Sequence, residues 1–88
     1  MKSPPPPIVG IGALAWRRDP VTVDYEIRFS ADVTGRRAAK GAVTGEPDAM
    51  REAFRAGYAR LRLDDGQDLE VQIVAHSDGA PTAYFQTR

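Results

Sequence analysis

Apolar and polar residues alternate without a break over residues 21–30 of this chain. The apolar set is Val21, Val23, Tyr25, Ile27 and Phe29, and the polar set is Thr22, Asp24, Glu26, Arg28 and Ser30. A period of two places the two sets on opposite faces of a β-strand. The pattern therefore predicts a strand with one face against a core and the other face toward water.

Residues 8–16 predict a preceding strand that is apolar on both faces, followed by a loop over residues 17–20. One face would carry Ile8, Leu14 and Trp16, and the other would carry Val9, Ile11, Ala13 and Ala15. Gly10 and Gly12 weaken this strand and permit a bulge or a close approach of another backbone. Residues 32–35 indicate a turn, and residues 36–44 indicate a third, poorer strand.

A helix is predicted to begin near Pro47, because proline suits the first helical position, where its missing N–H would have no helical partner. Apolar residues then follow the three–four spacing of one buried stripe: Met50, Ala53, Phe54 and Tyr58. Gly57 is predicted to end the helix after about three turns.

A hairpin follows, with the turn at Asp64, Asp65 and Gly66. A three-residue loop closed by glycine in the left-handed conformation pairs Leu63 with Gln67 and fixes the register. The expected cross-strand pairs are Leu61 with Leu69, Ala59 with Val71, Arg62 with Asp68, and Arg60 with Glu70. Apolar residues meet apolar ones and charges meet opposite charges, as cross-strand pairing prefers.

A last strand over residues 82–87 completes an order of three strands, one helix and three strands. This order predicts an α+β fold: an antiparallel sheet of about six strands with one helix packed on one face, as a roll or partial barrel. Residues 8–88 would form a single domain, and residues 1–7 a proline-rich N-terminal arm. Four consecutive prolines favour a polyproline II tail, which we interpret as a stiff end rather than a ligand for an aromatic groove.

Composition narrows the classes of function. The chain has 88 residues and no cysteine, so a disulfide, a thiolate metal site and a cysteine nucleophile are excluded. Twelve basic and twelve acidic residues give a formal net charge of zero, which does not favour binding through phosphates alone. The chain has no apolar run long enough for a membrane span, and we expect a cytoplasmic protein with no membrane partner.

Two motifs that resemble functional signatures are better explained by local structure. The residues from Gly10 to Ala15 fit a dinucleotide pattern, but prolines precede them and a second strand follows, leaving no room for the required helix. His76, Ser77 and Asp78 contain the residue types of a catalytic triad, yet side chains adjacent in sequence rarely converge. We predict no catalytic residue, no bound cofactor and no metal site.

Basic residues form two clusters, which are Arg17 with Arg18, and Arg36 and Arg37 with Lys40. These clusters favour nucleic-acid binding as an alternative function, although they fall at opposite ends of the second strand. A small ligand-binding or enzymatic fold is a further alternative, with a polar site around Tyr25, His76 and Tyr84.

The most unusual feature is apolar surface on faces that should be polar. Val74 interrupts the polar face of its strand, and Val9 and Ile11 lie on the second apolar face of the first strand. Either the sheet curls into a partial barrel that buries these residues, or they contact another chain. The main hypothesis is therefore a small non-enzymatic protein-interaction module, as a homodimer or as an accessory or inhibitor-type partner protein. Its predicted interaction surface comprises Val9, Ile11, Trp16, Arg17, Arg18 and Val74.

Overall fold

The computed structural model describes residues 6–17, 20–31 and 37–87. Six strands and one helix follow one another along these residues. They are β1 (Ile8–Ala15), β2 (Val21–Ala31), β3 (Arg37–Thr44), α1 (Pro47–Ala56), β4 (Tyr58–Arg62), β5 (Asp68–His76) and β6 (Thr82–Thr87). Arg18 and Arg36, which belong to the two basic clusters, and most of the proline-rich arm lie outside the described residues.

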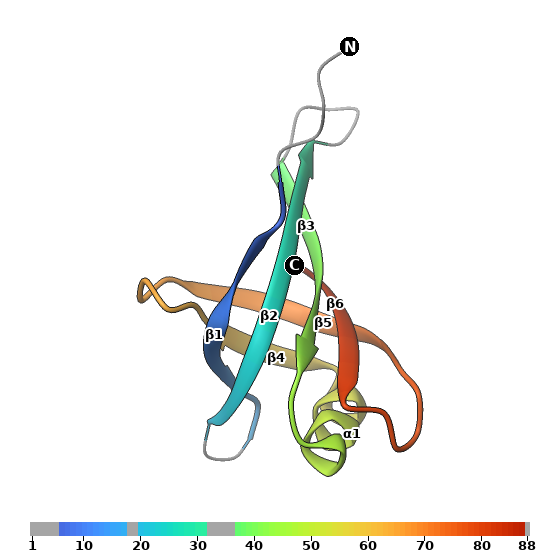
Figure 1. Cartoon of the computed structure of the whole chain (residues 1–88). Coiled ribbons are helices and arrows are strands. Elements are labelled where there is room, and N and C mark those ends of the chain that lie inside the picture. Colours follow the sequence, from blue (N-terminus) through green and yellow to red (C-terminus); the bar gives the residue numbers. More distant parts are fainter. Residues whose placement is uncertain (1–5, 18–19, 32–36, 88) are drawn as a thin grey trace.

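The six strands close into an antiparallel barrel in the order β1-β2-β3-β6-β5-β4 (Figure 1). Two three-stranded meanders build it, with the first strands β1 and β4 paired with each other and the last strands β3 and β6 paired likewise. The predicted antiparallel sheet of six strands with one helix is confirmed. The roll or partial barrel is corrected to a closed barrel, because the short β4 pairs with the end of β1 over Ala13–Ala15.

Two glycines allow the strands to approach closely where the barrel curves. A Cβ atom on Gly12 would collide with the backbone carbonyl oxygen of Arg62 on β4, at the β1–β4 seam. A Cβ atom on Gly41 would collide with the carbonyl oxygen of Glu26 and lie 2.8 Å from the ring of Phe85. The close backbone approach that the sequence allowed for Gly12 is therefore present, and it lies at the seam that closes the barrel.

The barrel interior and the inner side of α1 form one hydrophobic core. Its buried residues are Leu14, Val23, Tyr25, Ile27, Ala39, Val43, Ala49, Met50, Ala53, Leu61, Leu63, Val71, Ile73, Ala83 and Phe85. On β2 the inward set Val23, Tyr25 and Ile27 is buried, as the alternation predicts. Partly buried residues, Trp16 among them, pack against this core from its margin.

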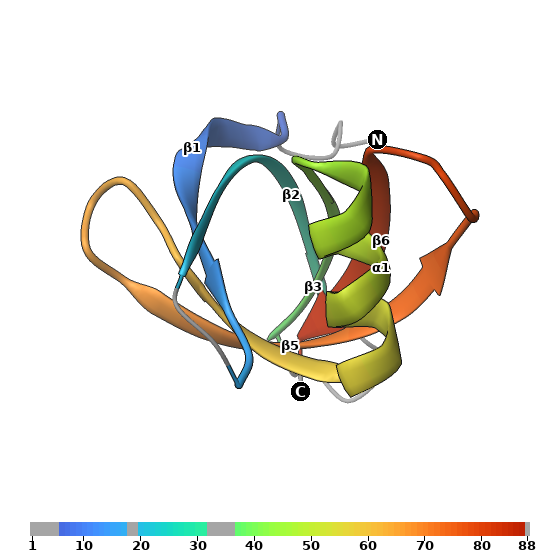
Figure 2. The same cartoon turned by 90° about the horizontal axis from the view of Figure 1, so that it is seen from below.

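Helix α1 packs against β4, β5 and β6 at one end of the barrel, where Figure 2 shows it covering one side of the opening. Met50 and Ala53 are fully buried, as the stripe predicts. The predicted burial is wrong for the other two members of that stripe, because Phe54 is 40% exposed and Tyr58 is 52% exposed. The helix ends at Ala56, and Gly57 adopts a positive φ of 85°, so Tyr58 already belongs to β4.

The β4–β5 hairpin has the predicted register. Leu61 pairs with Leu69 and Arg62 with Asp68, while the Leu63 N–H donates to the Gln67 carbonyl oxygen over 2.8 Å. Arg62 also donates from Nε to Asp68 Oδ1 over 2.9 Å. This charge-assisted hydrogen bond lowers the pKa of the Asp68 carboxyl below its ordinary value.

A β-bulge interrupts the pairing of β5 with β6 between Ile73 and Ala75. The bulge adds one residue to β5 and exchanges the two faces for the rest of the strand. Ala75, which the alternation predicts on the inner face, is therefore exposed and pairs with Tyr84. Val74 at the bulge remains 45% exposed, so it is an apolar residue on the outer face.

Candidate interaction surface

The outward side chains of neighbouring strands form three rows on one side of the barrel. The strand register places Val9, Glu26, Ala42 and Tyr84 in the middle row, which Val74 extends beside Tyr84. The row on one side contains Arg28, Lys40 and Gln86, and the row on the other contains Ile11, Asp24, Thr44 and Thr82. We call these residues together the groove face.

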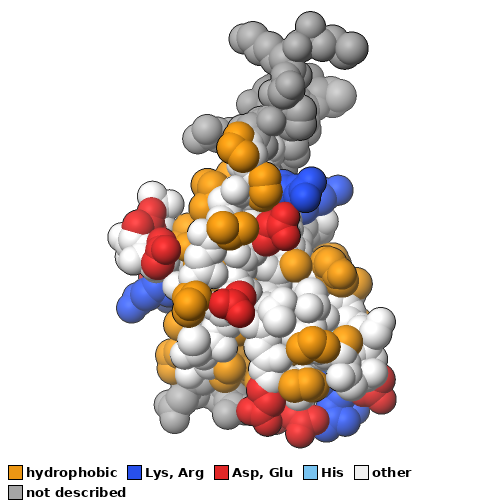
Figure 3. All heavy atoms as spheres, in the orientation of Figure 1, with side chains coloured by type: hydrophobic (Ala, Val, Ile, Leu, Met, Phe, Trp, Pro, Cys, Tyr) orange, Lys and Arg blue, Asp and Glu red, His pale blue; other side chains and the backbone are white. Residues whose placement is uncertain are grey.

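The groove face is hollowed along its centre. One hollow of about 600 Å³ lies between Val9, Ile11 and Tyr84, and an adjoining hollow of about 390 Å³ extends toward Val74. The depression follows from small residues, because Ala42 presents a single methyl group between the larger side chains of β2 and β6. Figure 3 shows hydrophobic side chains gathered over this side of the molecule, on either side of acidic ones.

Barrel closure does not bury the apolar residues of the groove face. The exposed fractions are 67% for Val9, 62% for Ile11, 55% for Tyr84 and 45% for Val74. The sequence offered two explanations for these residues: burial by a curled sheet, or contact with another chain. The sheet closes fully and the residues still face outward, so curling does not account for them. Several exposed apolar side chains gathered on one side of a small domain typically mark an interaction site.

Charge is distributed unevenly along the groove face. Arg28 and Lys40 lie opposite each other at one end, and Arg28 Nη2 contacts Glu26 Oε1 at 3.1 Å. Asp24 lies at the other end, is exposed, and forms no ion pair with any other described residue. Beside it, the hydroxyls of Thr44 and Thr82 are hydrogen-bonded to each other over 3.0 Å. The face therefore has basic residues at one end and an acidic residue at the other, and Glu26 lies among the apolar residues of the middle row.

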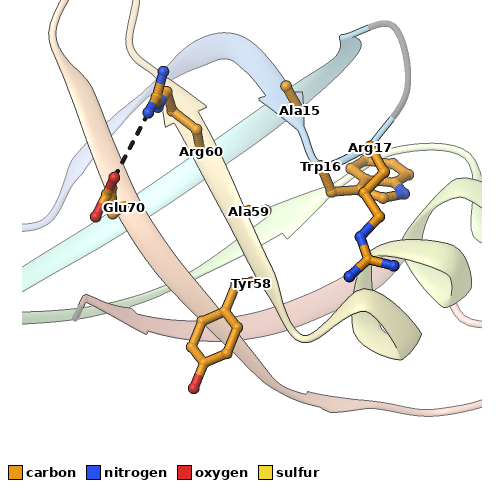
Figure 4. A pocket seen from close by; sticks show the side chains of 7 residues that line it. All are labelled: Ala15, Trp16, Arg17, Tyr58, Ala59, Arg60 and Glu70. Carbon is orange, nitrogen blue, oxygen red and sulfur yellow. Dashed lines mark ion pairs between the residues drawn. The ribbon is translucent and has the colours of Figure 1, made fainter.

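Trp16 and Arg17 lie in a different hollow from the groove face. They line a pocket of about 450 Å³ together with Ala15, Tyr58, Ala59, Arg60 and Glu70 (Figure 4). In this pocket Arg60 Nη2 contacts Glu70 Oε1 at 3.6 Å, and the ring of Tyr58 points away from that ion pair. The predicted interaction surface is thus divided: Val9, Ile11 and Val74 share the groove face, whereas Trp16 and Arg17 do not belong to it.

The three residues proposed for a polar site have different environments. Tyr25 is buried, with its hydroxyl accepting a hydrogen bond from the Asp64 N–H over 3.3 Å, and burial raises the pKa of its phenol. A ring nitrogen of His76 is 2.9 Å from the Ala80 carbonyl oxygen, and its ring lies near that of Phe54. Tyr84 is on the groove face.

Several groove-face residues were not identified from the sequence as part of an interaction surface. Asp24, Lys40 and Ala42 belong to two different strands, and Tyr84 belongs to the last. Each outward position can be found by alternation, but their neighbourhood depends on the pairing of β3 with β6. That pairing joins segments about 40 positions apart, and no local pattern specifies it.

Comparison with protein-family models, curated proteins and solved structures finds no significant match to this chain. Among the residues that the structure describes, no helix has the length and apolar character needed to cross a membrane. The same residues contain no group of three or more histidine, cysteine or acidic side chains arranged to hold a metal ion.

Proposed function

We propose that this protein is a small non-enzymatic interaction module that binds another protein chain through its groove face. The observation that carries the proposal is the exposure of Val9, Ile11, Tyr84 and Val74 around two adjoining hollows of a closed barrel. Burying these side chains against a partner would remove apolar surface from water, which stabilises association.

The composition of the groove face supports the same function. Protein interfaces commonly have an apolar centre that contains aromatic residues, surrounded by a polar and charged rim. Here Tyr84 and Val9 occupy the middle row, while Arg28, Lys40 and Asp24 lie in the rows on either side. The charged rows would give a partner its orientation, and the middle row would give most of the binding free energy.

Tyr84→Glu tests the proposal, and Tyr58→Glu is its matched control. The two tyrosines are exposed to 55% and 52%, so both substitutions should leave the core intact, but Tyr58 lies outside the groove face. We expect Tyr84→Glu to reduce the amount of partner chain that is cross-linked to this protein in cells at least about tenfold. The reason is that the substitution places a charge beside the exposed apolar side chains of the groove face. Tyr58→Glu should retain the wild-type yield.

Cross-linking to a second copy of this chain and cross-linking to another protein both count as binding in this experiment. Equal cross-linking by wild type, Tyr84→Glu and Tyr58→Glu would contradict the proposal. Loss of cross-linking with Tyr58→Glu alone would place the interaction at the pocket of Trp16 and Arg17 instead.

A further inference from the structure

We propose that β1 binds an extended segment of another protein as an added strand along residues 8–12, on the side away from β2. The segment is apolar and carries a basic residue at one end. This inference goes beyond the proposed function, because it concerns the backbone of β1 rather than the side chains of the groove face. Addition of an extended segment to an exposed sheet edge is a recurring mode of peptide recognition.

β1 has a strand on both of its sides over only part of its length. β2 pairs with it from Ile8 to Leu14, whereas β4 pairs with it only from Ala13 to Ala15. Figure 1 shows β1 and β2 continuing together past the β4–β5 hairpin. Away from β2, residues 8–12 therefore have no strand partner among the described residues, and we call this side of them the free edge. Alternate residues of a strand direct N–H and C=O to the same side, so the free edge presents backbone groups to a further strand.

The side chain of Ile8 is left uncovered beside the free edge. Ile8 pairs with Ile27, and residues directly opposite in a sheet point to the same face. Ile27 is fully buried, as is Leu14 on the same face of β1, yet Ile8 is 46% exposed. Leu14 lies where β4 pairs with β1, and Ile8 lies where no described strand does. A strand added at the free edge would cover this inward-facing side chain.

The free edge lacks the features that commonly prevent pairing with another chain, which are charged side chains, proline and bulges. Its sequence from residue 8 to residue 12 is Ile-Val-Gly-Ile-Gly, and its pairing with β2 has no register shift. Pro7 before it has no N–H to donate, so the added pairing would begin at Ile8. An added strand would find Ile8 on the inner face and the exposed Val9 and Ile11 on the outer face. Apolar side chains on both of its own faces would suit this position.

The β4–β5 turn places two carboxylates beside the free edge. Oδ2 of Asp64 lies 2.9 Å from the position that a Cβ atom on Gly10 would occupy. Asp64 and the adjacent Asp65 form no ion pair with another described residue, whereas Arg62 is already paired with Asp68. A lysine or arginine at the end of an added strand would meet these two carboxylates, and an acidic residue there would be repelled.

Three synthetic peptides test the inference. The first alternates valine and threonine between two terminal lysines, the second has glutamate in place of both lysines, and the third has proline in place of the central valine. We expect the lysine peptide to shift the amide signals of residues 8–12 and to slow hydrogen exchange of the N–H groups at the free edge. At low salt the glutamate peptide should bind at least about tenfold more weakly. The proline peptide should leave these signals unchanged, because proline cannot donate to the ladder.

Asp64→Lys tests the charge contact, and Asp78→Lys is its matched control. Asp78 is exposed in the β5–β6 connection, so it does not belong to the β4–β5 turn. Asp64→Lys should bind the lysine peptide at least about tenfold more weakly than wild type, and Asp78→Lys should bind it like wild type. Circular dichroism checks that both variants are folded.

Failure of this inference can be told apart from failure of the proposed function. No shift at residues 8–12 with the lysine peptide, or equal binding of the lysine and proline peptides, would overturn the added strand. If that happens while Tyr84→Glu still reduces cross-linking, the proposed function stands. Binding of the lysine peptide at the free edge, together with wild-type cross-linking by Tyr84→Glu, would support the added strand and contradict the groove face.

Discussion

Gly12→Ala is expected to destabilise the barrel by about 3 kcal/mol, near the upper end of the usual cost of overpacking. The added methyl group would collide with the Arg62 carbonyl oxygen, a backbone atom that cannot rotate away. Relief would require β1 and β4 to separate where they close the barrel, over the short pairing from Ala13 to Ala15. Denaturant unfolding followed by circular dichroism measures this loss as a lower midpoint.

Two other substitutions on β1 serve as comparisons. Val9→Ala removes atoms from an exposed side chain and should change the free energy of unfolding by less than about 0.5 kcal/mol. Gly10→Ala should cost less than Gly12→Ala, because the nearest atom to its new methyl group is the phenol oxygen of Tyr25, at the end of a side chain. Equal stability of wild type and Gly12→Ala would contradict the tight β1–β4 seam.

Met50→Ala is expected to lower the free energy of unfolding by about 2–5 kcal/mol, the usual cost of truncating a fully buried large side chain. Met50 is 0% exposed and joins α1 to the barrel core. A domain of this size has a total stability of about 5–15 kcal/mol, so the variant would be close to unfolding at elevated temperature. Thermal unfolding by calorimetry or circular dichroism measures the change.

Phe54→Ala is the control for the helix, since Phe54 is larger than Met50 but 40% exposed. It should cost less than Met50→Ala even though it removes more atoms. The opposite order would mean that α1 contacts the barrel through the face carrying Phe54.

The most accurate sequence predictions concern segments whose structure is determined locally. The hairpin register follows from the glycine turn at Gly66 and from matching residue pairs within about ten positions of each other. The faces of β2 follow from an alternation that contains no glycine or proline. In each segment the local residue preferences and the burial pattern favour the same arrangement.

The sequence was less informative where distant segments meet. Barrel closure depends on β1 with β4 and on β3 with β6, two pairings between residues far apart in the chain. The bulge in β5 inserts one residue and exchanges the faces, so simple alternation places Ala75 wrongly. The exposed apolar residues Val9, Ile11 and Val74 were recognised as unusual, but Tyr84 and the charges around them join the same surface only through these pairings.

The most direct test of the groove face as the contact surface is photo-cross-linking in cells, with a photoreactive side chain placed at Tyr84 in one variant and at Tyr58 in another. If the groove face binds another chain, the variant labelled at Tyr84 should capture a partner chain and the variant labelled at Tyr58 should not. Capture from Tyr58 alone, or from neither position, would contradict the proposed contact surface.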